Sequence, residues 1–206
     1  MVHYKLTYFP MRGIGEIVRQ LFELAHVEYE DCRIEREVWP ELKHTAPFGQ
    51  LPMLEVDGQK LPQSKAIMRY VAQKYGFAGA DDWESAQIDS WADQYVDFLV
   101  ELRPWFYIKF AGGEGDEAAV YRDTVEAKRD VLFPLFVRQL KENGSGFLVG
   151  KTITWVDLLL STHLETFTSL KPDYIEKYPE LQEFLKRVHA IPEIAAWIER
   201  RPKTDL

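Results

Sequence analysis

Strand-like patterns in this chain are confined to its first 62 residues, whereas the patterns after residue 81 are helical. Residues 2–9 alternate apolar and polar side chains, which is the period of a strand with one buried face. Apolar side chains follow at helical spacing over residues 17–25, and residues 27–34 are predicted to form a second strand. This order predicts a βαβ unit of ordinary length.

A hairpin and a further helix complete the first part of the chain. Asp57 and Gly58 tolerate positive φ and separate two short strand-like stretches, which predicts a tight turn between antiparallel strands. Ser64 is predicted to cap the next helix, which ends at Gly76. A short helix is predicted from Trp39 onward, because the proline after it suits a first helical turn. The predicted order of the first part is therefore βαβ and then ββα.

The remainder of the chain carries helix starts and long helical periods. Asp81 with Glu84, and Thr154 with Asp157, have the spacing of a capping box. Long helices are predicted over residues 88–102 and 118–140, and further helices over 178–190 and 193–200. We expect two domains, an α/β thioredoxin-like N-terminal domain at residues 2–79 and an all-α C-terminal helical domain at 81–206.

Composition excludes several classes of protein. The 206 residues are 46% hydrophobic and 28% charged, which suits a globular chain with a sizeable core. The net charge of -8 argues against a nucleic-acid partner, because phosphate binding requires a basic face. The single cysteine, Cys32, cannot form an internal disulfide. No signal-peptide pattern and no membrane-length apolar run is present, so a cytoplasmic protein without a membrane span is expected.

The common motifs of metal and nucleotide enzymes do not occur in the sequence. It contains no Walker loop, no GxGxxG, no HExxH and no cysteine cluster. A thioredoxin-like domain that did dithiol chemistry would need Cys-x-x-Cys, and Cys32 instead follows the first helix. Dithiol redox chemistry by this chain is therefore not expected.

Short motifs occur throughout the chain, at residues 4–9, 11–13, 39–43, 47–52, 63–64 and 154–157, followed by a distinctive ending at 190–202. In this order and at these intervals they resemble sigma-class glutathione transferases, especially the nematode members and vertebrate haematopoietic prostaglandin D synthase. The resemblance implies the cytosolic glutathione transferase fold. It also implies conjugation of the thiolate of reduced glutathione to hydrophobic electrophiles, a detoxification reaction.

Tyr8 is the candidate catalytic residue. A free thiol with a pKa of about 8.5 is only about 3% ionised at pH 7, so a hydroxyl that donates to the sulfur would stabilise the reactive thiolate. Tyr8 remains a donor at neutral pH, and it ends a predicted strand beside a loop. The alternative is that Tyr8 only completes the buried face of its strand.

The resemblance implies a further set of glutathione contacts. The backbone at Leu51 would pair with the cysteinyl part of the tripeptide, in a turn for which a cis peptide before Pro52 is expected. Gln63 and Ser64 would take the γ-glutamyl carboxylate, a role that suits a helix N-terminus. A helix cap alone is the other interpretation of Ser64. The complete implied set of glutathione-binding residues is Tyr8, Trp39, Lys43, Gly49, Gln50, Leu51, Pro52, Gln63, Ser64 and Asp97 of the partner subunit.

Trp39 and Lys43 stand four residues apart on one predicted helix and resemble the pair that contacts the glycine end of glutathione. The alternative is a packing tryptophan and a solvated lysine. Asp89, Asp93 and Asp97 repeat every four residues, so three like charges share one helix face and something should compensate them. The resemblance implies that Asp97 approaches glutathione in the partner of a homodimer, and a plain solvated acidic face is the alternative.

The second-substrate pocket is expected to involve Phe9, Met11, Gly13, residues 105–107 and the C-terminal helices. Ile14 replaces a basic residue of the prostaglandin synthase, and the acidic cluster is thinner than the one that holds cations there, so no metal is expected. Two alternative functions share this scaffold. One is glutathione-dependent prostaglandin D synthase-type isomerisation, and the other is non-catalytic binding of haem or lipid-like ligands or a crystallin-like role.

Overall fold

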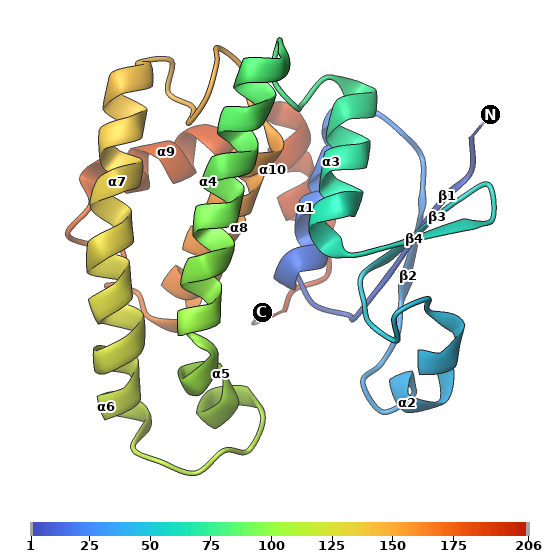
Figure 1. The fold of residues 1–206 in the computed structure, drawn as a ribbon, viewed down its shortest axis with the longest axis horizontal. Coiled ribbons are helices and arrows are strands. Elements are labelled where there is room, and N and C mark those ends of the chain that lie inside the picture. The colour runs from blue at the N-terminus through green and yellow to red at the C-terminus, as the bar shows by residue number, and fades with distance from the viewer. Residues whose placement is uncertain (1, 205–206) are drawn as a thin grey trace.

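The computed structural model describes residues 2–204, and within them it has two parts. One part is a four-stranded sheet with three helices, and the other is a bundle of helices (Figure 1). The first part consists of β1 (Tyr4–Tyr8), η1 (Gly13–Gly15), α1 (Glu16–Leu24), β2 (Glu30–Arg33), α2 (Trp39–Leu42), η2 (Lys43–Thr45), β3 (Met53–Val56), β4 (Gln59–Pro62) and α3 (Ser64–Tyr75). The second consists of α4 (Asp82–Glu101), α5 (Arg103–Phe110), α6 (Glu117–Val120), η3 (Tyr121–Glu126), α7 (Ala127–Asn143), α8 (Trp155–Leu170), α9 (Pro179–His189) and α10 (Pro192–Arg200).

The sheet has the strand order β2-β1-β3-β4. β1 and β2 are parallel because α1 connects them as a crossover, whereas β3 pairs antiparallel with both β1 and β4. The turn between β3 and β4 has positive φ at both Asp57 and Gly58, as a two-residue hairpin turn requires. The predicted βαβ and ββα order is therefore confirmed.

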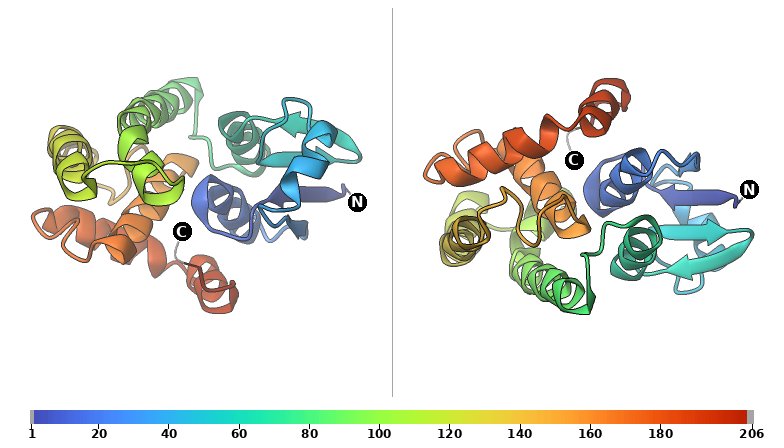
Figure 2. Two further views of the ribbon diagram at one scale, coloured as in Figure 1. Left: turned by 90° about the horizontal axis from the view of Figure 1, so that it is seen from below. Right: turned by 90° about the horizontal axis from the view of Figure 1, so that it is seen from above.

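α1 lies between the sheet and the helical bundle, with α3 beside it (Figure 1). For this reason α1 is buried all round from Glu16 to Phe22, including its charged residues. α10, at the end of the chain, packs on α1 (Figure 2). One apolar cluster runs through both parts, from Tyr4 and Leu6 in the sheet to Trp155 in α8. The two parts thus share a continuous core.

The predicted helix starts of the bundle are confirmed. Asp81 accepts from the backbone of Glu84 at 2.8 Å, while the Glu84 carboxylate accepts from the backbone of Ala80. Thr154 and Asp157 form a complete capping box, and the buried Asp157 also accepts from the backbone of Leu148. The bonds within each capping box satisfy backbone donors that helix starts leave without partners, and the bond from Leu148 attaches the preceding loop to α8.

Two features of the bundle differ from the sequence prediction. The helix expected over residues 118–140 is interrupted by one π-helical segment, η3. Residues 103–110 form a separate helix, α5, because Pro104 suits its first turn and cannot continue α4.

A further correction concerns the start of α3. Its N-cap residue is Gln63, with φ of 74°, whereas Ser64 is already helical and does not cap.

No helix among residues 2–204 is long and apolar enough to cross a membrane.

Candidate active site

Three chain segments meet at one edge of the sheet. β1 ends at Tyr8, where Thr7 pairs with Met53 of β3, so Tyr8 stands opposite Pro52 just beyond the last pair. Met53 also pairs with Pro62 of β4, which brings Gln63 to the same edge. The Leu51–Pro52 peptide is cis, as expected from the sequence. The register of the sheet therefore gathers Tyr8, the cis-proline turn and the start of α3.

Tyr8 is only 7% exposed, and its ring lies against the loop that follows β1. Burial raises the pKa of the Tyr8 hydroxyl above its ordinary value, while a hydrogen bond with the backbone of Ile14 and the charges of Arg19 and Arg36 act in the opposite direction. Tyr8 is consequently protonated at neutral pH. A protonated phenol held by a backbone contact can donate its hydrogen to an anion that binds beside it.

Two glycines of this loop allow Tyr8 to lie where it does. A Cβ atom on Gly13 would stand 2.7 Å from the Tyr8 hydroxyl oxygen, and one on Gly15 would stand 2.5 Å from ring atom Cδ1. Gly13 also has φ of 44°, which other residues rarely adopt. The sequence analysis did not assign Gly15 a role. The spacing of glycines after a strand-ending tyrosine was the signal available for it.

Replacing Gly15 with alanine is expected to lower the rate of glutathione conjugation about tenfold, because the new Cβ forces the Tyr8 ring to move and small misplacements of a reacting group are costly. Steady-state kinetics measures this loss. Gly113→Ala is the matched control. Its Cβ would stand 2.4 Å from Cδ1 of Tyr107, but that ring is 63% exposed and free to turn aside. Equal rates for both variants and the wild type would contradict the role assigned to Gly15.

Arg19 holds the loop after Tyr8 from within α1. Its fully buried guanidinium donates to the carbonyl of Met11 at 2.7 Å and contacts Asp31 of β2 at 3.0 Å. The same group lies 5.8 Å from the centre of the Tyr8 ring. Sequence reasoning missed Arg19, because a charged residue on an amphipathic helix is ordinarily assigned to solvent.

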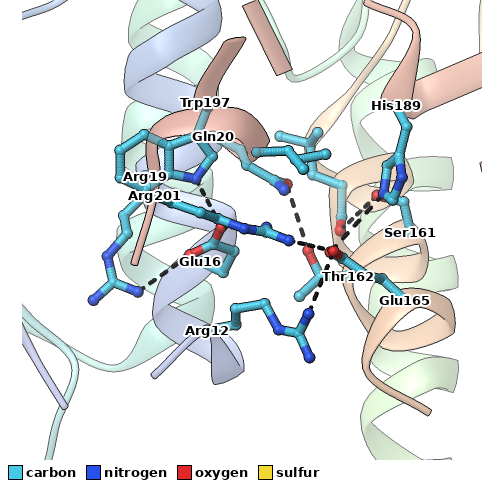
Figure 3. A network of polar contacts seen from close by, with 12 residues as sticks. Arg12, Glu16, Arg19, Gln20, Ser161, Thr162, Glu165, His189, Trp197 and Arg201 are labelled. Carbon is cyan, nitrogen blue, oxygen red and sulfur yellow. Dashed lines mark hydrogen bonds and ion pairs between the residues drawn. The ribbon is translucent and has the colours of Figure 1, made fainter. Parts of the chain in front are cut away.

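A network of buried charges joins the two parts behind this loop (Figure 3). Glu16 of α1 accepts from the indole of Trp197 at 2.7 Å and from Arg201 at 2.7 Å. Arg201 also contacts Glu165 of α8, and Arg12 lies 3.3 Å from the same carboxylate. The loop that carries Arg12 is thereby attached to α8 and to the end of the chain.

The sequence-predicted residues for the glycine end lie near this edge. The ring centroids of Trp39 and Phe9 lie 6.2 Å apart, which places α2 beside the residue that follows Tyr8. Lys43 and Gln50 are exposed, and the side chain of Lys43 passes over Gly49, where a Cβ would stand 3.3 Å from its Cε atom. Gly49 has φ of 59°, so it suits this turn. The charge of Lys43 is therefore available to a ligand.

The acidic face of α4 is compensated by two cations of α3. Arg69 contacts Asp89 at 2.8 Å, and Lys65 contacts Asp93 at 2.6 Å. The hydrogen bond from Lys65 lowers the pKa of Asp93. Asp97 is exposed one turn further along. Among residues 2–204, no group of three or more His, Cys, Asp or Glu side chains is arranged to hold a metal ion.

A mainly apolar cavity of about 240 Å³ lies between the loop after β1 and helices α4, α5 and α8. Met11, Gly13 and Phe106 line it as the sequence analysis expected, and Ile14 lines it too. Gly13 lines this cavity and also lies beside the Tyr8 hydroxyl. The cavity therefore adjoins the hydroxyl that ends β1.

Four expectations about this pocket were wrong. Phe9 does not line the cavity and instead packs between the rings of Tyr8 and Trp39. Trp105 is fully buried in the core, and Tyr107 is mostly exposed. Successive residues of a helix point about 100° apart, so only Phe106 of these three can face the cavity. Of the C-terminal helices, α8 contributes to the lining, whereas α9 and α10 do not.

Comparisons with known proteins identify the family that has this combination of a thioredoxin-like domain and a helical domain. The model of the glutathione S-transferase N-terminal domain matches residues 4–73, and that of the C-terminal domain matches residues 100–201. The chain belongs to the glutathione S-transferase family.

Its relatives include nematode enzymes of the same length. Glutathione S-transferase 1 of Ascaris suum is 45% identical, with 99% of each chain covered. Among solved structures, a Nu-class glutathione transferase of Haemonchus contortus is 46% identical with a TM-score of 0.92 and all of both chains covered. A monomeric glutathione transferase of Necator americanus is 44% identical with a TM-score of 0.95, covering 99% of this chain and all of that one. A prostaglandin synthase D of Nilaparvata lugens is 38% identical with a TM-score of 0.88, and the match covers 98% of this chain and all of that one.

Proposed function

We propose that this protein conjugates the thiolate of reduced glutathione to small hydrophobic electrophiles, as a detoxifying enzyme of the sigma class located in the cytoplasm. The observation that carries this proposal is the position of Gly13, which lies beside the Tyr8 hydroxyl and also lines the apolar cavity. A thiol bound at the sheet edge beside Tyr8 would stand next to an electrophile in the cavity. The proposed domain bounds are residues 2–79 and 81–206.

The glutathione site is assigned to the residues gathered at the sheet edge. The backbone of Leu51, held by the cis peptide before Pro52, offers pairing groups to the cysteinyl part. Gln63 and Ser64 stand at the N-terminus of the twelve-residue α3, which favours the γ-glutamyl carboxylate. Trp39, Lys43, Gly49 and Gln50 are assigned to the glycine end, where the charge of Lys43 suits a carboxylate.

Tyr8 acts by stabilising the thiolate. Its hydroxyl donates a hydrogen bond to the glutathione sulfur, so the thiol loses its proton to water more readily. The thiolate then forms a bond to the electrophilic carbon, and the electron pair of the broken bond departs with a leaving group such as chloride. No covalent bond to the protein is formed. The electrophile is held by apolar contacts, which favours a broad range of substrates.

The direct test combines glutathione binding with turnover of an aryl halide, 1-chloro-2,4-dinitrobenzene. Calorimetric titration with glutathione and the absorbance of the conjugate report the two properties separately. Binding together with turnover is expected. Glutathione binding without turnover would favour a carrier of hydrophobic ligands, for which the apolar cavity is the supporting observation. Isomerisation of a prostaglandin endoperoxide is expected to be slow, because Ile14 puts an apolar side chain in the cavity wall.

A homodimer is proposed as the working form, with Asp97 of each subunit reaching the γ-glutamyl amine bound by the other. Two-fold pairing is the commonest solution for an oligomer, and the exposed Asp97 carboxylate is available for such a contact. Because the Necator americanus relative is monomeric, family membership alone does not decide the assembly.

Light scattering at micromolar concentration is expected to give twice the chain mass of 24.1 kDa. Asp97→Ala is expected to weaken glutathione binding several-fold, because an opposite charge next to the amine is lost. Glu101→Ala, one turn along the same helix and paired with Lys128, serves as the control and should bind normally. A measured mass of one chain, or unchanged glutathione affinity of the Asp97 variant, would contradict the proposed contact of Asp97 with glutathione in the partner subunit.

A further inference from the structure

A chain of three hydrogen-bonding side chains forms part of the cavity wall. The hydroxyl of Tyr95, on α4, lies 3.0 Å from Nδ1 of His163, on α8. The other ring nitrogen of His163, Nε2, lies 2.9 Å from the hydroxyl of Tyr174. Tyr95 and His163 line the cavity, whereas Tyr174 does not and is 1% exposed. Both tyrosines are buried, with Tyr95 5% exposed, but only Tyr95 belongs to a residue pair that forms part of the cavity wall.

His163 is neutral at physiological pH. Burial lowers the pKa of its imidazole to about 3. Within residues 2–204 its hydrogen bonds and ring contacts are with the two tyrosine hydroxyls and the rings of Tyr95, Phe98, Phe133, Phe167 and Tyr174, and no carboxylate is among these partners. A neutral imidazole has one N–H donor and one nitrogen that accepts.

The three groups carry one more hydrogen than their two hydrogen bonds use. Each tyrosine supplies one hydroxyl hydrogen and the imidazole supplies one, which makes three hydrogens for two bonds. His163 must donate to one tyrosine and accept from the other. The tyrosine that accepts from His163 therefore retains a hydroxyl hydrogen that neither bond uses.

The surroundings decide which tyrosine this is. If Tyr174 kept the unused hydrogen, a buried donor would be left without an acceptor, since among the described residues its hydroxyl contacts only His163. If Tyr95 keeps it, the donor belongs to a residue of the cavity wall, and water or a substrate in the cavity is an available acceptor. The second arrangement is the less costly one, so His163 carries its hydrogen on Nδ1 and Tyr174 donates to Nε2.

We infer that Tyr95, held by His163, presents a free O–H to the electrophile pocket and gives the enzyme a preference for α,β-unsaturated carbonyl compounds. This inference rests on the proposed function. The same cavity extends from Gly13, beside the Tyr8 hydroxyl, to Tyr95 and His163. An electrophile could thus meet the thiolate at one end and a hydrogen-bond donor at the other.

The chemistry of conjugate addition suits this arrangement. The thiolate forms a bond to the β-carbon, and the π electrons of the carbon–carbon double bond shift toward the carbonyl oxygen to give an enolate. The Tyr95 O–H would donate to that oxygen more strongly as its negative charge develops. The α-carbon then takes a proton from water, and the enolate returns to a carbonyl. Displacement of chloride from benzyl chloride develops no charge on a carbonyl oxygen, so it gains nothing from Tyr95.

Tyr95→Phe separates the two kinds of substrate. We expect the ratio of kcat/KM for trans-2-nonenal to kcat/KM for benzyl chloride to fall about tenfold, because only the unsaturated carbonyl loses a hydrogen bond that strengthens in the transition state. Equal losses with both substrates would overturn the inference, because a packing defect does not distinguish them. Benzyl chloride turnover by the wild type reports whether the proposed transferase function holds, so its failure is visible separately.

The hydrogen position can be measured without turnover. Nitrogen-15 NMR of histidine-labelled protein distinguishes protonated from bare ring nitrogens, and His163→Asn identifies the signal among the five histidines. We expect the hydrogen of His163 on Nδ1. A hydrogen on Nε2 would mean that Tyr95 donates to His163, and this would overturn the inference even in an active enzyme. In Tyr174→Phe the tautomer is no longer fixed, so the His163 signals should shift and the nonenal rate should fall while benzyl chloride turnover is retained.

Discussion

Replacing Tyr8 with phenylalanine is expected to lower turnover near neutral pH by about 10- to 150-fold while fold and glutathione affinity are largely kept. The ring and its packing against Gly15 remain, and only the hydroxyl that faces Gly13 is lost. A hydrogen bond to a charged group contributes roughly 1.5–3 kcal/mol, which corresponds to this range of rates. The remaining glutathione contacts proposed at the sheet edge do not involve that hydroxyl.

The thiol pKa provides the decisive measurement for Tyr8→Phe. Thiolate absorbance of bound glutathione, and the dependence of rate on pH, should both show the pKa rising toward its solution value of about 8.5. Activity should therefore recover at high pH, where the thiolate forms without help. Tyr75→Phe is a matched control, because it also deletes a tyrosine hydroxyl in the same domain, one that donates to Tyr4 at 2.8 Å. An unchanged thiol pKa in a folded Tyr8→Phe protein would transfer the activating role to another donor in the 12–15 loop.

Replacing Glu16 with alanine is expected to destabilise the protein by about 3–5 kcal/mol, because it leaves buried positive charge without its partner. Glu16 is 1% exposed and accepts hydrogen bonds from Trp197, Arg201 and Arg19. For a chain of this size the loss corresponds to a fall in Tm of roughly 6–20 °C, which thermal unfolding measures. The contacts join the first helix to the end of the chain (Figure 3).

Glu183→Ala is the control for this prediction. Glu183 also forms an ion pair, with Lys186 at 2.9 Å, but both groups are exposed, so its loss should leave Tm unchanged. Glu16→Gln retains the size of the side chain and an acceptor oxygen, and an intermediate Tm is expected. If the alanine variant melted within about 2 °C of the wild type, the network would not stabilise the junction between the two parts.

Two features of the candidate site could be predicted from local sequence, whereas its glutathione-binding residues were implied by the family resemblance. Tyr8 ends β1 because alternation stops at a loop, and the cis peptide at Pro52 precedes β3 where a proline cannot donate a ladder bond. The cap of α3 was predicted wrongly. Ser64 has the side chain of a capping residue, but it is the first residue of the helix. The cap position is taken by Gln63, whose φ is 74°. Local pattern identifies a helix start and does not resolve such a shift.

The pocket was predicted less well, because its lining depends on rotation about helix axes. Residues 105–107 were expected in it as a group, yet one is core, one lines the cavity and one is exposed. The acidic face of α4 required compensation, and the sequence could not say that Arg69 of α3 provides it. These contacts join residues on separate helices, whose relative rotation no local period specifies.

By itself, the sequence determined the order of strands and helices, the separation into an α/β part and a helical part, and the candidate role of Tyr8. The first two follow from periods, caps and turns that act over a few residues, whereas the role of Tyr8 is what the resemblance to glutathione transferases implies. Only the tertiary structure decided that Glu16 and Arg19 are buried, that Arg201 reaches Glu16 across 185 positions, and that Tyr95, His163 and Tyr174 share two hydrogen bonds. A polar residue on a helix has the same local pattern whether it faces water or another helix, and its partner is chosen only when distant segments pack together.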